Sequence, residues 1–313
     1  MSEPSGSVQQ EVINVETTTA DQSQTIQEGM NRRHIQLTTE NLRTNEPFGD
    51  VMQEKAEGTF RIWGNNFNGL HIDDSGGDFM ELCDGAATMQ ADVVTGTEHN
   101  LDARKYYVRK KCYDTCMKNR NVGHYKLQMS STAIKAATLY KPGGTLVLAR
   151  GNCIARTIEG GDDDMGRWSY VRMAAKANRV VSIITAYQPC DVRGAHKGKF
   201  TVHAQQCSIL REQNMDDPKP NPRKYFRRDL TTFLKSLKAK GDDIILMGDF
   251  NEVLGNDPAG MSKLCRDLVL SDVMKMRHEI SDKPATYARG SKRLDYILMS
   301  ERCAVSIRQC GYE

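Results

Sequence analysis

The chain has 313 residues, of which 39% are apolar, and a formal net charge of +3, which is too small to indicate a partner by itself. Its length allows one large domain or two smaller ones. No run of about 18 apolar residues is present, which argues against a membrane-spanning helix. The 9 cysteines form no Cys-x-x-Cys pair, and no Lys or Arg precedes Arg32. We therefore expect free thiols in a reducing compartment rather than a disulfide or zinc framework, no secretory signal, and an intracellular protein.

The first segment, residues 1–58, is rich in Ser, Thr, Gln, Glu and Asn and has few large apolar residues. Such a composition cannot bury enough surface to offset the entropy of ordering the chain. It predicts a disordered polar tail, with a long amphipathic helix as the alternative. An ordered domain is expected to begin at residue 59 and to extend to residue 313.

Two early strands are expected to end in polar side chains. Residues 60–70 are typical of a strand that runs into a polar turn, and Asn66 and Asn68, two residues apart, would share a face of it. Residues 91–100 predict a second buried strand with Glu98 at its end. A lone Glu at a strand end is usually solvated surface, so this position alone leaves a functional role open.

Two later segments are strongly basic. Residues 101–126 combine many Lys and Arg side chains with four tyrosines, and a helix predicted from Pro222 carries Lys and Arg away from its apolar stripe. Basic residues with interleaved aromatics suit a surface that follows a nucleic-acid backbone. The alternative is a solvated helix face whose tyrosines pack on the core. The four tyrosines of residues 101–126 are Tyr106, Tyr107, Tyr113 and Tyr125.

Polar groups also follow the central strands. Residues 180–185 predict a buried strand, and Tyr187 lies just beyond its end. Residues 244–247 predict another buried strand, followed by Asp249 and Asn251, which would project together because they are two residues apart. An Asp beside an Asn can orient a water and hydrogen-bond a phosphate oxygen. The alternative is an ordinary turn, which Gly, Asp and Asn favour in any case.

A last acidic residue lies inside an apolar strand. Asp295 stands between Leu294 and Tyr296. A charged group there costs free energy unless it is paired, which favours burial for a function. The alternative is an edge strand with Asp295 facing water.

The polar groups described above lie in five short motifs, each of which follows or interrupts a predicted strand. In chain order the motifs are WGNNFNGL, TEHN, AYQPC, GDFNE and RLDYIL. Over residues 59–313 the chain resembles the endonuclease/exonuclease/phosphatase (DNase I-like) superfamily, which includes the endonucleases of non-LTR retrotransposons. The resemblance implies a four-layer α/β sandwich of two mixed sheets packed face to face with helices outside. The predicted order of strands and helices agrees with this fold class.

The resemblance implies a metal site. Glu98 is similar in position to the main ligand of a catalytic Mg²⁺, with Mn²⁺ as the alternative ion, and Asn68 to a second polar group near the metal. Carboxylate, water and phosphate oxygens are the ligands that this hard ion prefers. Asn66 resembles the residue that hydrogen-bonds the scissile phosphate or supports the base.

The resemblance also implies the groups that act on the phosphodiester. Asp249 would orient or deprotonate the attacking water, Asn251 would hold the phosphate, and Tyr187 would donate to a phosphate oxygen or act as a phenolate. In the family, the residue at Asp295 orients a histidine in a Ser-Asp-His element further on. The last histidine of this sequence is His278, so we expect the final strand and that histidine to be missing, the chain to be C-terminally truncated, and catalysis to be strongly reduced or absent.

The function predicted from the sequence is Mg²⁺-dependent hydrolysis of DNA phosphodiesters, by a retrotransposon-type endonuclease that binds the phosphate backbone in the nucleus. One alternative is an inositol-phosphate or lipid phosphatase of the same superfamily. Another is a nucleic-acid-binding remnant without catalysis. No membrane partner is expected, and the sequence leaves the oligomeric state open.

Overall fold

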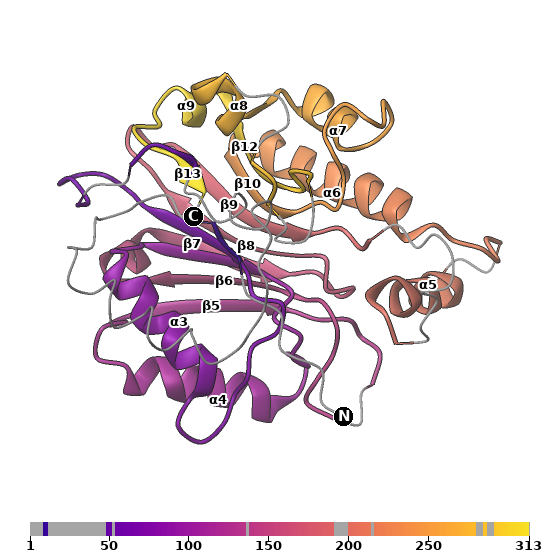
Figure 1. Cartoon of the computed structure of the whole chain (residues 1–313), viewed down its shortest axis with the longest axis horizontal. Helices are drawn as coiled ribbons and strands as arrows, with labels where there is room; N and C mark the ends of the chain where they lie inside the picture. Colours follow the sequence, from indigo (N-terminus) through magenta and orange to yellow (C-terminus); the bar gives the residue numbers. More distant parts are fainter. Residues whose placement is uncertain are drawn as a thin grey trace, which may run out of the picture.

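Two β-sheets pack face to face and helices cover their outer sides (Figure 1). The computed structural model describes residues 9–11, 48–51, 54–135, 138–190, 200–213, 216–279, 284–286 and 291–312. Both sheets are mixed, since each contains one parallel strand pair among antiparallel pairs. The predicted fold class, an α/β sandwich of two mixed sheets flanked by helices, is confirmed.

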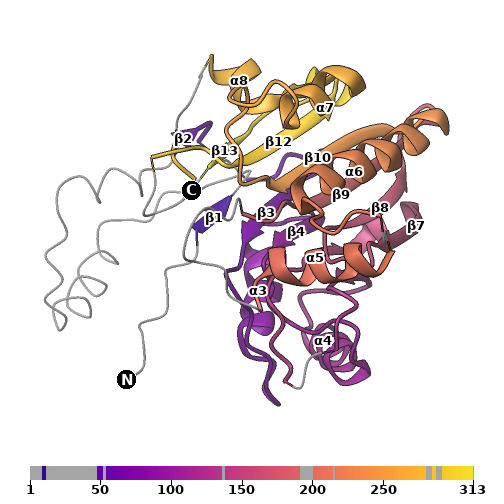
Figure 2. The ribbon, with the colours of Figure 1, turned by 90° about the vertical axis from the view of Figure 1, so that its right-hand side faces the viewer.

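The first sheet is built from the N-terminal half of the domain. Its strand order is β1 (Gln9–Glu11), β3 (Ile62–Asn66), β4 (Val93–Thr97), β6 (Thr145–Arg150) and β5 (Tyr125–Ser130). Helices α3 (Gly77–Thr88) and α4 (Tyr106–Lys118) cover its outer face (Figure 2). Apolar side chains on the inner faces of these helices, among them Phe79 and Cys112, pack against Trp63 and Leu148 of the sheet.

The second sheet holds the central strands predicted from the sequence. Its order is β11 (Leu270–Asp272), β12 (Asp295–Ser300), β10 (Asp243–Asp249), β9 (Val180–Tyr187), β8 (Trp168–Ala174) and β7 (Thr157–Asp162). Helices α6 (Pro222–Ala239) and α7 (Met261–Leu268) cover its outer face. The remaining elements are η2 (Gly151–Arg156), α5 (Val202–Gln213), α8 (Val273–His278), α9 (Glu301–Ala304) and a small sheet of β2 (Phe48–Gly49) with β13 (Gly311–Tyr312).

The space between the sheets explains the near-continuous apolar runs of the central strands. Ile183 and Ile245 contribute to the core between the sheets, whereas Ile184 and Ile244 contribute to the core under α6. A strand with helices on one face and a second sheet on the other must be apolar on both faces. At one end of the inter-sheet space lies a cavity of about 690 Å³, whose lining includes none of the site residues predicted from the sequence.

Helix α6 follows its sequence signals closely. Pro222 is its first residue, and the Asn221 side chain accepts hydrogen bonds from the backbone N–H groups of Arg223 and Lys224. Asn is a favoured N-cap and Pro a favoured first helical residue, so the start is well specified. The predicted apolar stripe is buried at Phe226, Leu230, Leu234 and Leu237. Gly241, with φ +87°, then takes the left-handed conformation that commonly ends a helix.

Most of the predicted polar tail, residues 1–58, lies outside the described residues. Within it, Gln9–Glu11 pairs with β3, and Phe48–Gly49 pairs with Gly311–Tyr312. The domain boundary at residue 58 stays a prediction. No helix among the described residues is both long and apolar enough to cross a membrane.

Candidate active site

Strand ends bring the predicted residues to one edge of the sandwich. In the first sheet, β3 and β4 are parallel and Asn66 pairs with Thr97, which places Glu98 just beyond the same edge. In the second sheet, β9 and β10 are parallel and Tyr187 pairs with Asp249. An Asn66 Nδ2 to Asp249 Oδ2 hydrogen bond of 3.4 Å links the two sheets at this edge. Residues separated by more than a hundred positions therefore meet, as the resemblance of the motifs implied.

Glu98 is held by one group from each sheet. Its carboxylate accepts hydrogen bonds from the Tyr187 hydroxyl and the Asn66 amide. Burial raises the pKa of Glu98 above its ordinary value, and these two hydrogen bonds oppose that shift. The alternative of a freely solvated surface Glu is wrong, because the side chain is half-buried and hydrogen-bonded to Tyr187 and Asn66.

Asp249 lies at the centre of the cluster. Its Oδ1 accepts a hydrogen bond of 2.8 Å from the Asn251 backbone N–H, and its Oδ2 one of 3.1 Å from Asn251 Nδ2. Asn251 Nδ2 also donates to the Gln188 carbonyl at 2.9 Å. Burial, and then the charges of Asp295 and Glu98, raise the pKa of Asp249 well above its ordinary value. The carboxylate thus lies where negative charge is already concentrated.

Asp295 is buried at the start of an interior strand. It pairs with Asp249 across β10 and β12, and β12 lies between β10 and β11. Its side chain is only 7% exposed, so the buried interpretation is confirmed and the exposed-edge alternative is wrong. Asn66 and Asp295 line one small cavity between the sheets, together with Thr97, Thr185 and other residues.

Asn68 does not share a strand face with Asn66, and that expectation is wrong. Strand β3 ends at Asn66, and Asn68 has φ +46°, in the left-handed region. Its backbone N–H donates to Asn66 Oδ1 at 3.1 Å, while its side chain is exposed. Among the described residues, no hydrogen bond joins the Asn68 and Glu98 side chains. Its assignment as a second metal group stays a prediction.

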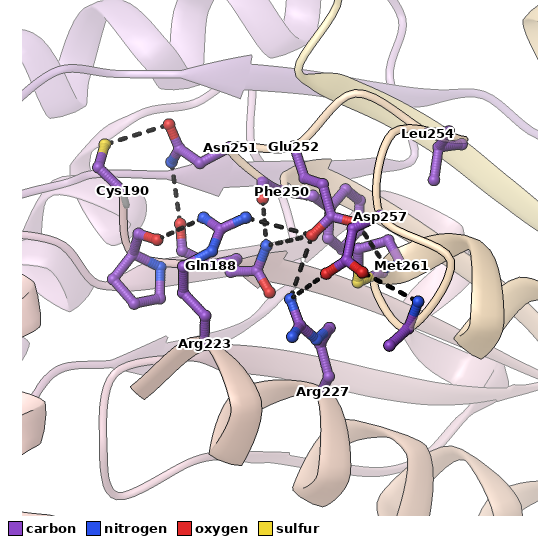
Figure 3. Close-up of polar contacts among 12 residues, drawn as sticks. Gln188, Cys190, Arg223, Arg227, Phe250, Asn251, Glu252, Leu254, Asp257 and Met261 are labelled. Carbon is purple, nitrogen blue, oxygen red and sulfur yellow. Dashed lines mark hydrogen bonds and ion pairs between the residues drawn. The ribbon is translucent and has the colours of Figure 1, made fainter. Parts of the chain in front are cut away.

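A buried ion network beside the cluster was not predicted (Figure 3). Glu252 Oε2 accepts hydrogen bonds from Arg223 at 3.2 Å and from Arg227 at 3.3 Å, both from α6, and its Oε1 accepts from the Met261 backbone N–H at 2.7 Å. Arg223 also donates to the Pro189 carbonyl at 2.8 Å. The network ties the segments after β9 and β10 to α6. A signal was present, since Arg223 and Arg227 are four apart and share a helix face.

Three carboxylates at one edge suit a divalent cation. Glu98, Asp249 and Asp295 come from both sheets, and the charges of the other two raise the pKa of Asp249. Buried negative charges repel one another unless a cation neutralises them. Carboxylate and amide oxygens are the donors that a hard divalent ion prefers. The residues present therefore fit such an ion.

His99 is adjacent to Glu98 but plays a structural part. It is fully buried, its Nδ1 accepts from the Leu101 backbone N–H at 3.0 Å, and its Nε2 therefore carries the hydrogen and donates to the Ser130 carbonyl at 2.9 Å. Burial lowers the pKa of His99 to about 4, although interactions of the ring with the backbone of Ser130 and Thr145 oppose the shift. The ring is thus neutral near pH 7.

The His99 pKa predicts a loss of stability in acid. Because the folded pKa of about 4 lies below the ordinary 6.5, the unfolded chain binds a proton first as the pH falls. Above pH 6.5 the free energy of unfolding keeps the full contribution of neutral His99. Between pH 6.5 and 4 the free energy of unfolding should fall by about 3 kcal/mol. Urea unfolding across this pH range measures it. His99→Gln should be less stable at neutral pH but should show a correspondingly flatter pH profile, and an unchanged profile would contradict the assignment.

Comparison with known proteins gives the class. A profile of the Endonuclease/Exonuclease/phosphatase family matches residues 87–311. The chain belongs to this family. No curated protein sequence matches it significantly.

The chain is similar to several solved structures, among them one with a TM-score above 0.5. The AP endonuclease LMAP from Leishmania major is similar, with a TM-score of 0.52, 13% identity, and coverage of 88% of this chain and 98% of that chain. A 3' phosphatase, NExo, from Neisseria bound to a product DNA hairpin has a TM-score of 0.48 and 15% identity, over 80% of this chain and 90% of that chain. At such identities the likeness to LMAP shows the fold alone, so the reaction has to be argued from the site.

Proposed function

We propose that the chain is a metal-dependent phosphodiester hydrolase acting on DNA, with Mg²⁺ as the ion, Mn²⁺ as its substitute, and a retrotransposon-type endonuclease as the subclass. The observation that carries the proposal is the meeting of Glu98, Asp249 and Asp295 beside the hydrogen-bond donors Asn66 and Tyr187. Carboxylates for a cation and donors for a phosphate in one place suit phosphoryl chemistry. A DNA substrate would also imply a nuclear location.

Each side chain has a part in this proposal. Glu98 would hold the ion, which when bound supplies positive charge to the phosphate. Asp249 would orient the attacking water and accept its proton, because it is the central carboxylate and has a raised pKa. Asn251 holds Asp249 in place and would present its amide to a phosphate oxygen.

Tyr187 would act as a donor rather than as a phenolate. Burial, and then the charge of Glu98, raise the pKa of Tyr187 well above its ordinary value, and the hydroxyl already donates to Glu98. A phenolate at this position would lie beside carboxylates and lose that hydrogen bond. We therefore assign Tyr187 to stabilising negative charge on Glu98 or on a phosphate oxygen.

Basic residues beside the site support a polymeric substrate. Arg223 places the N-terminal turn of α6 against Pro189, close to Tyr187, and Lys224 in that turn is exposed. In the other basic segment, Tyr106 and Tyr107 are 79% and 48% exposed, so these two tyrosines do not pack on the core. Exposed cations and aromatic rings are suited to a nucleic-acid backbone.

Salt dependence separates DNA from a small phosphate ester. We expect the logarithm of the affinity for duplex DNA, measured in EDTA, to fall against the logarithm of salt concentration with a slope of about −3 or steeper. Lys224→Gln should make the slope shallower by about one, because each phosphate contact contributes about −0.9. Lys263→Gln on α7 is the matched control and should leave it unchanged.

The same assay discriminates the alternatives. A flat salt profile together with hydrolysis of an inositol phosphate would replace the DNA enzyme with a small-molecule phosphatase. Steep DNA binding with no nicking in Mg²⁺ or Mn²⁺ would instead identify a nucleic-acid-binding remnant. The expectation that catalysis is reduced without a histidine after Asp295 stays a prediction, and appending the family's C-terminal element tests it.

A further inference from the structure

Three metal-binding side chains meet at the small sheet of β2 and β13. Asp50 follows β2, His278 ends α8, and Cys310 precedes β13. Their ligand atoms all lie within 4.8 Å of one another. His278 Nε2 lies 3.7 Å from Cys310 Sγ and 3.8 Å from Asp50 Oδ2. None of these residues belongs to the candidate active site, and the sequence prediction of free thiols without a zinc framework did not anticipate the cluster.

These separations fit a tetrahedral zinc ion. Zinc binds Cys sulfur at about 2.3 Å and His nitrogen or carboxylate oxygen at about 2.0–2.2 Å. Around a tetrahedral ion with a single sulfur ligand, atoms at those distances lie about 3.3–3.6 Å apart. The two measured separations, 3.7 and 3.8 Å, are close to this range. Cys, His and carboxylate together form a donor set that suits zinc rather than magnesium or calcium.

The backbone is shaped to bring the three groups together. Gly49 has φ +110°, and a Cβ there would lie 3.2 Å from His278 Nε2 and 2.7 Å from the Cys310 carbonyl oxygen. Glycine alone allows this approach without strain. The Cys310 backbone N–H donates to Asp50 Oδ2 at 2.8 Å, and His278 Nε2 lies 2.9 Å from the Cys310 carbonyl oxygen. The cluster is therefore preassembled.

We propose that Asp50, His278 and Cys310 form a structural zinc site that fastens residue 50 and α8 to the β13 segment. The ion would have three protein ligands, and water would complete the tetrahedron. On binding, the Cys310 thiol loses its proton to solvent. The His278 ring releases its Nε2 proton to solvent and takes one up at Nδ1, so Nε2 gives up its hydrogen bond to the Cys310 carbonyl and can bind the ion.

The site has one built-in competitor. Arg277 forms an ion pair with Asp50 Oδ2, the oxygen that faces His278. A guanidinium and a zinc ion beside the same oxygen repel each other, so Arg277 must shift toward the other carboxylate oxygen when zinc binds. Removing this cation should tighten zinc binding, whereas removing it from a merely hydrogen-bonded cluster would give no affinity for metal.

The site also reaches the active-site strand. Tyr312, two residues after Cys310, donates from its hydroxyl to the Asp295 carbonyl at 3.0 Å. Zinc at Cys310 would therefore restrain the start of β12, where Asp295 lies. This consequence rests on the structure of the site and is independent of the reaction that the cluster of carboxylates performs.

The test is a titration of the full chain with zinc in the presence of saturating Mg²⁺, followed by thermal unfolding. We expect one zinc per chain, a higher Tm with zinc, and cobalt–thiolate absorption when Co²⁺ replaces zinc. Cys310→Ser and His278→Gln should each weaken zinc binding by at least about tenfold, and Arg277→Gln should strengthen it. Far-UV circular dichroism without metal establishes that each variant is folded.

Two further variants locate the metal. Cys265→Ser removes a partly buried thiol elsewhere and should leave zinc binding unchanged. Cys190→Ser removes a thiol that contacts Asn251 Oδ1 at 3.1 Å, so cobalt–thiolate absorption that disappears in this variant would place the metal in the active site. That outcome, or zinc binding that survives both Cys310→Ser and His278→Gln, would overturn the proposal.

Discussion

Replacing Asp249 with Asn should lower the rate of DNA nicking by a factor of about 10²–10⁴, the usual contribution of a positioned general base. The amide keeps the shape of the side chain, but it cannot accept a proton from water, and its NH₂ group cannot accept the hydrogen bonds that Oδ2 receives from the Asn251 and Asn66 amides. The backbone N–H of Asn251 donates to Oδ1 at 2.8 Å, and an amide oxygen accepts this hydrogen bond equally well. The rate of hydrolysis should therefore fall while the affinity for DNA changes little.

The stability of the same variant checks the electrostatic argument. Burial and neighbouring carboxylates raise the folded pKa of Asp249 above its unfolded value. The folded state therefore holds its proton to higher pH, and the stabilisation is lost as the pH rises through the window between the two values. Because the folded state disfavours the charged carboxylate, removal of the charge opposes the loss of the hydrogen bonds at Oδ2, and Asp249→Asn should change the Tm measured without metal only slightly.

A control separates this role from a general effect of acid removal. Asp267 on α7 is exposed in part and pairs with Lys263 four residues earlier. Asp267→Asn should keep the nicking rate within about twofold, because exposed pairs contribute little. A nicking rate in Asp249→Asn close to that of the unmodified protein would remove Asp249 from the reaction.

Strand periodicity predicted that each polar group follows a strand, and the resemblance of the five motifs to the family implied that these strand ends share one site. Apolar runs before Tyr187 and Asp249 indicate buried strands, and parallel neighbours such as β9 and β10 end at the same edge. Asp295 could be assigned to the interior for a similar reason, since an acid in an apolar run needs an explanation. Both inferences depend on apolar runs in the sequence, which correspond directly to buried strands in the structure.

The positions just beyond the strands could not be predicted in the same way. Asn68, Glu98 and Asn251 have φ values of +46°, +54° and +46°. The left-handed region is uncommon for residues other than glycine, and for Glu nothing in the sequence indicates it. In this conformation the alternation of a strand no longer applies, which is why Asn68 leaves the face of Asn66. Non-glycine residues in this region often gather at functional sites.

The ion network of Glu252 shows a second limit. Composition shows that α6 is basic, but not that Arg223 and Arg227 turn toward a buried carboxylate rather than toward solvent. Which cations are paired inside and which remain for a partner depends on how α6 lies on the second sheet. The number of basic residues in a sequence therefore overstates the charge available to a bound partner.

Replacing Glu98 with Gln should remove most metal-dependent activity, because Glu98 is the carboxylate that the donors of both sheets hold in place. The Tyr187 hydroxyl and the Asn66 amide donate to it, and a neutral amide offers one acceptor oxygen without charge. We expect Mg²⁺ to bind at least about 100-fold more weakly and the nicking rate to fall by at least about 10². The measurement is a Mg²⁺ titration of nicking, with direct calorimetry of metal binding.

The form of the titration distinguishes a ligand from a group that only shapes the site. If Glu98 holds the ion, high Mg²⁺ should recover part of the rate in Glu98→Gln, whereas it should recover none in Asp249→Asn. Glu81→Gln, on the exposed side of α3, is the matched control and should titrate like the unmodified protein. An unchanged Mg²⁺ affinity in Glu98→Gln would instead place the ion on Asp249 and Asp295, and Glu98 would then serve to orient Tyr187 and Asn66.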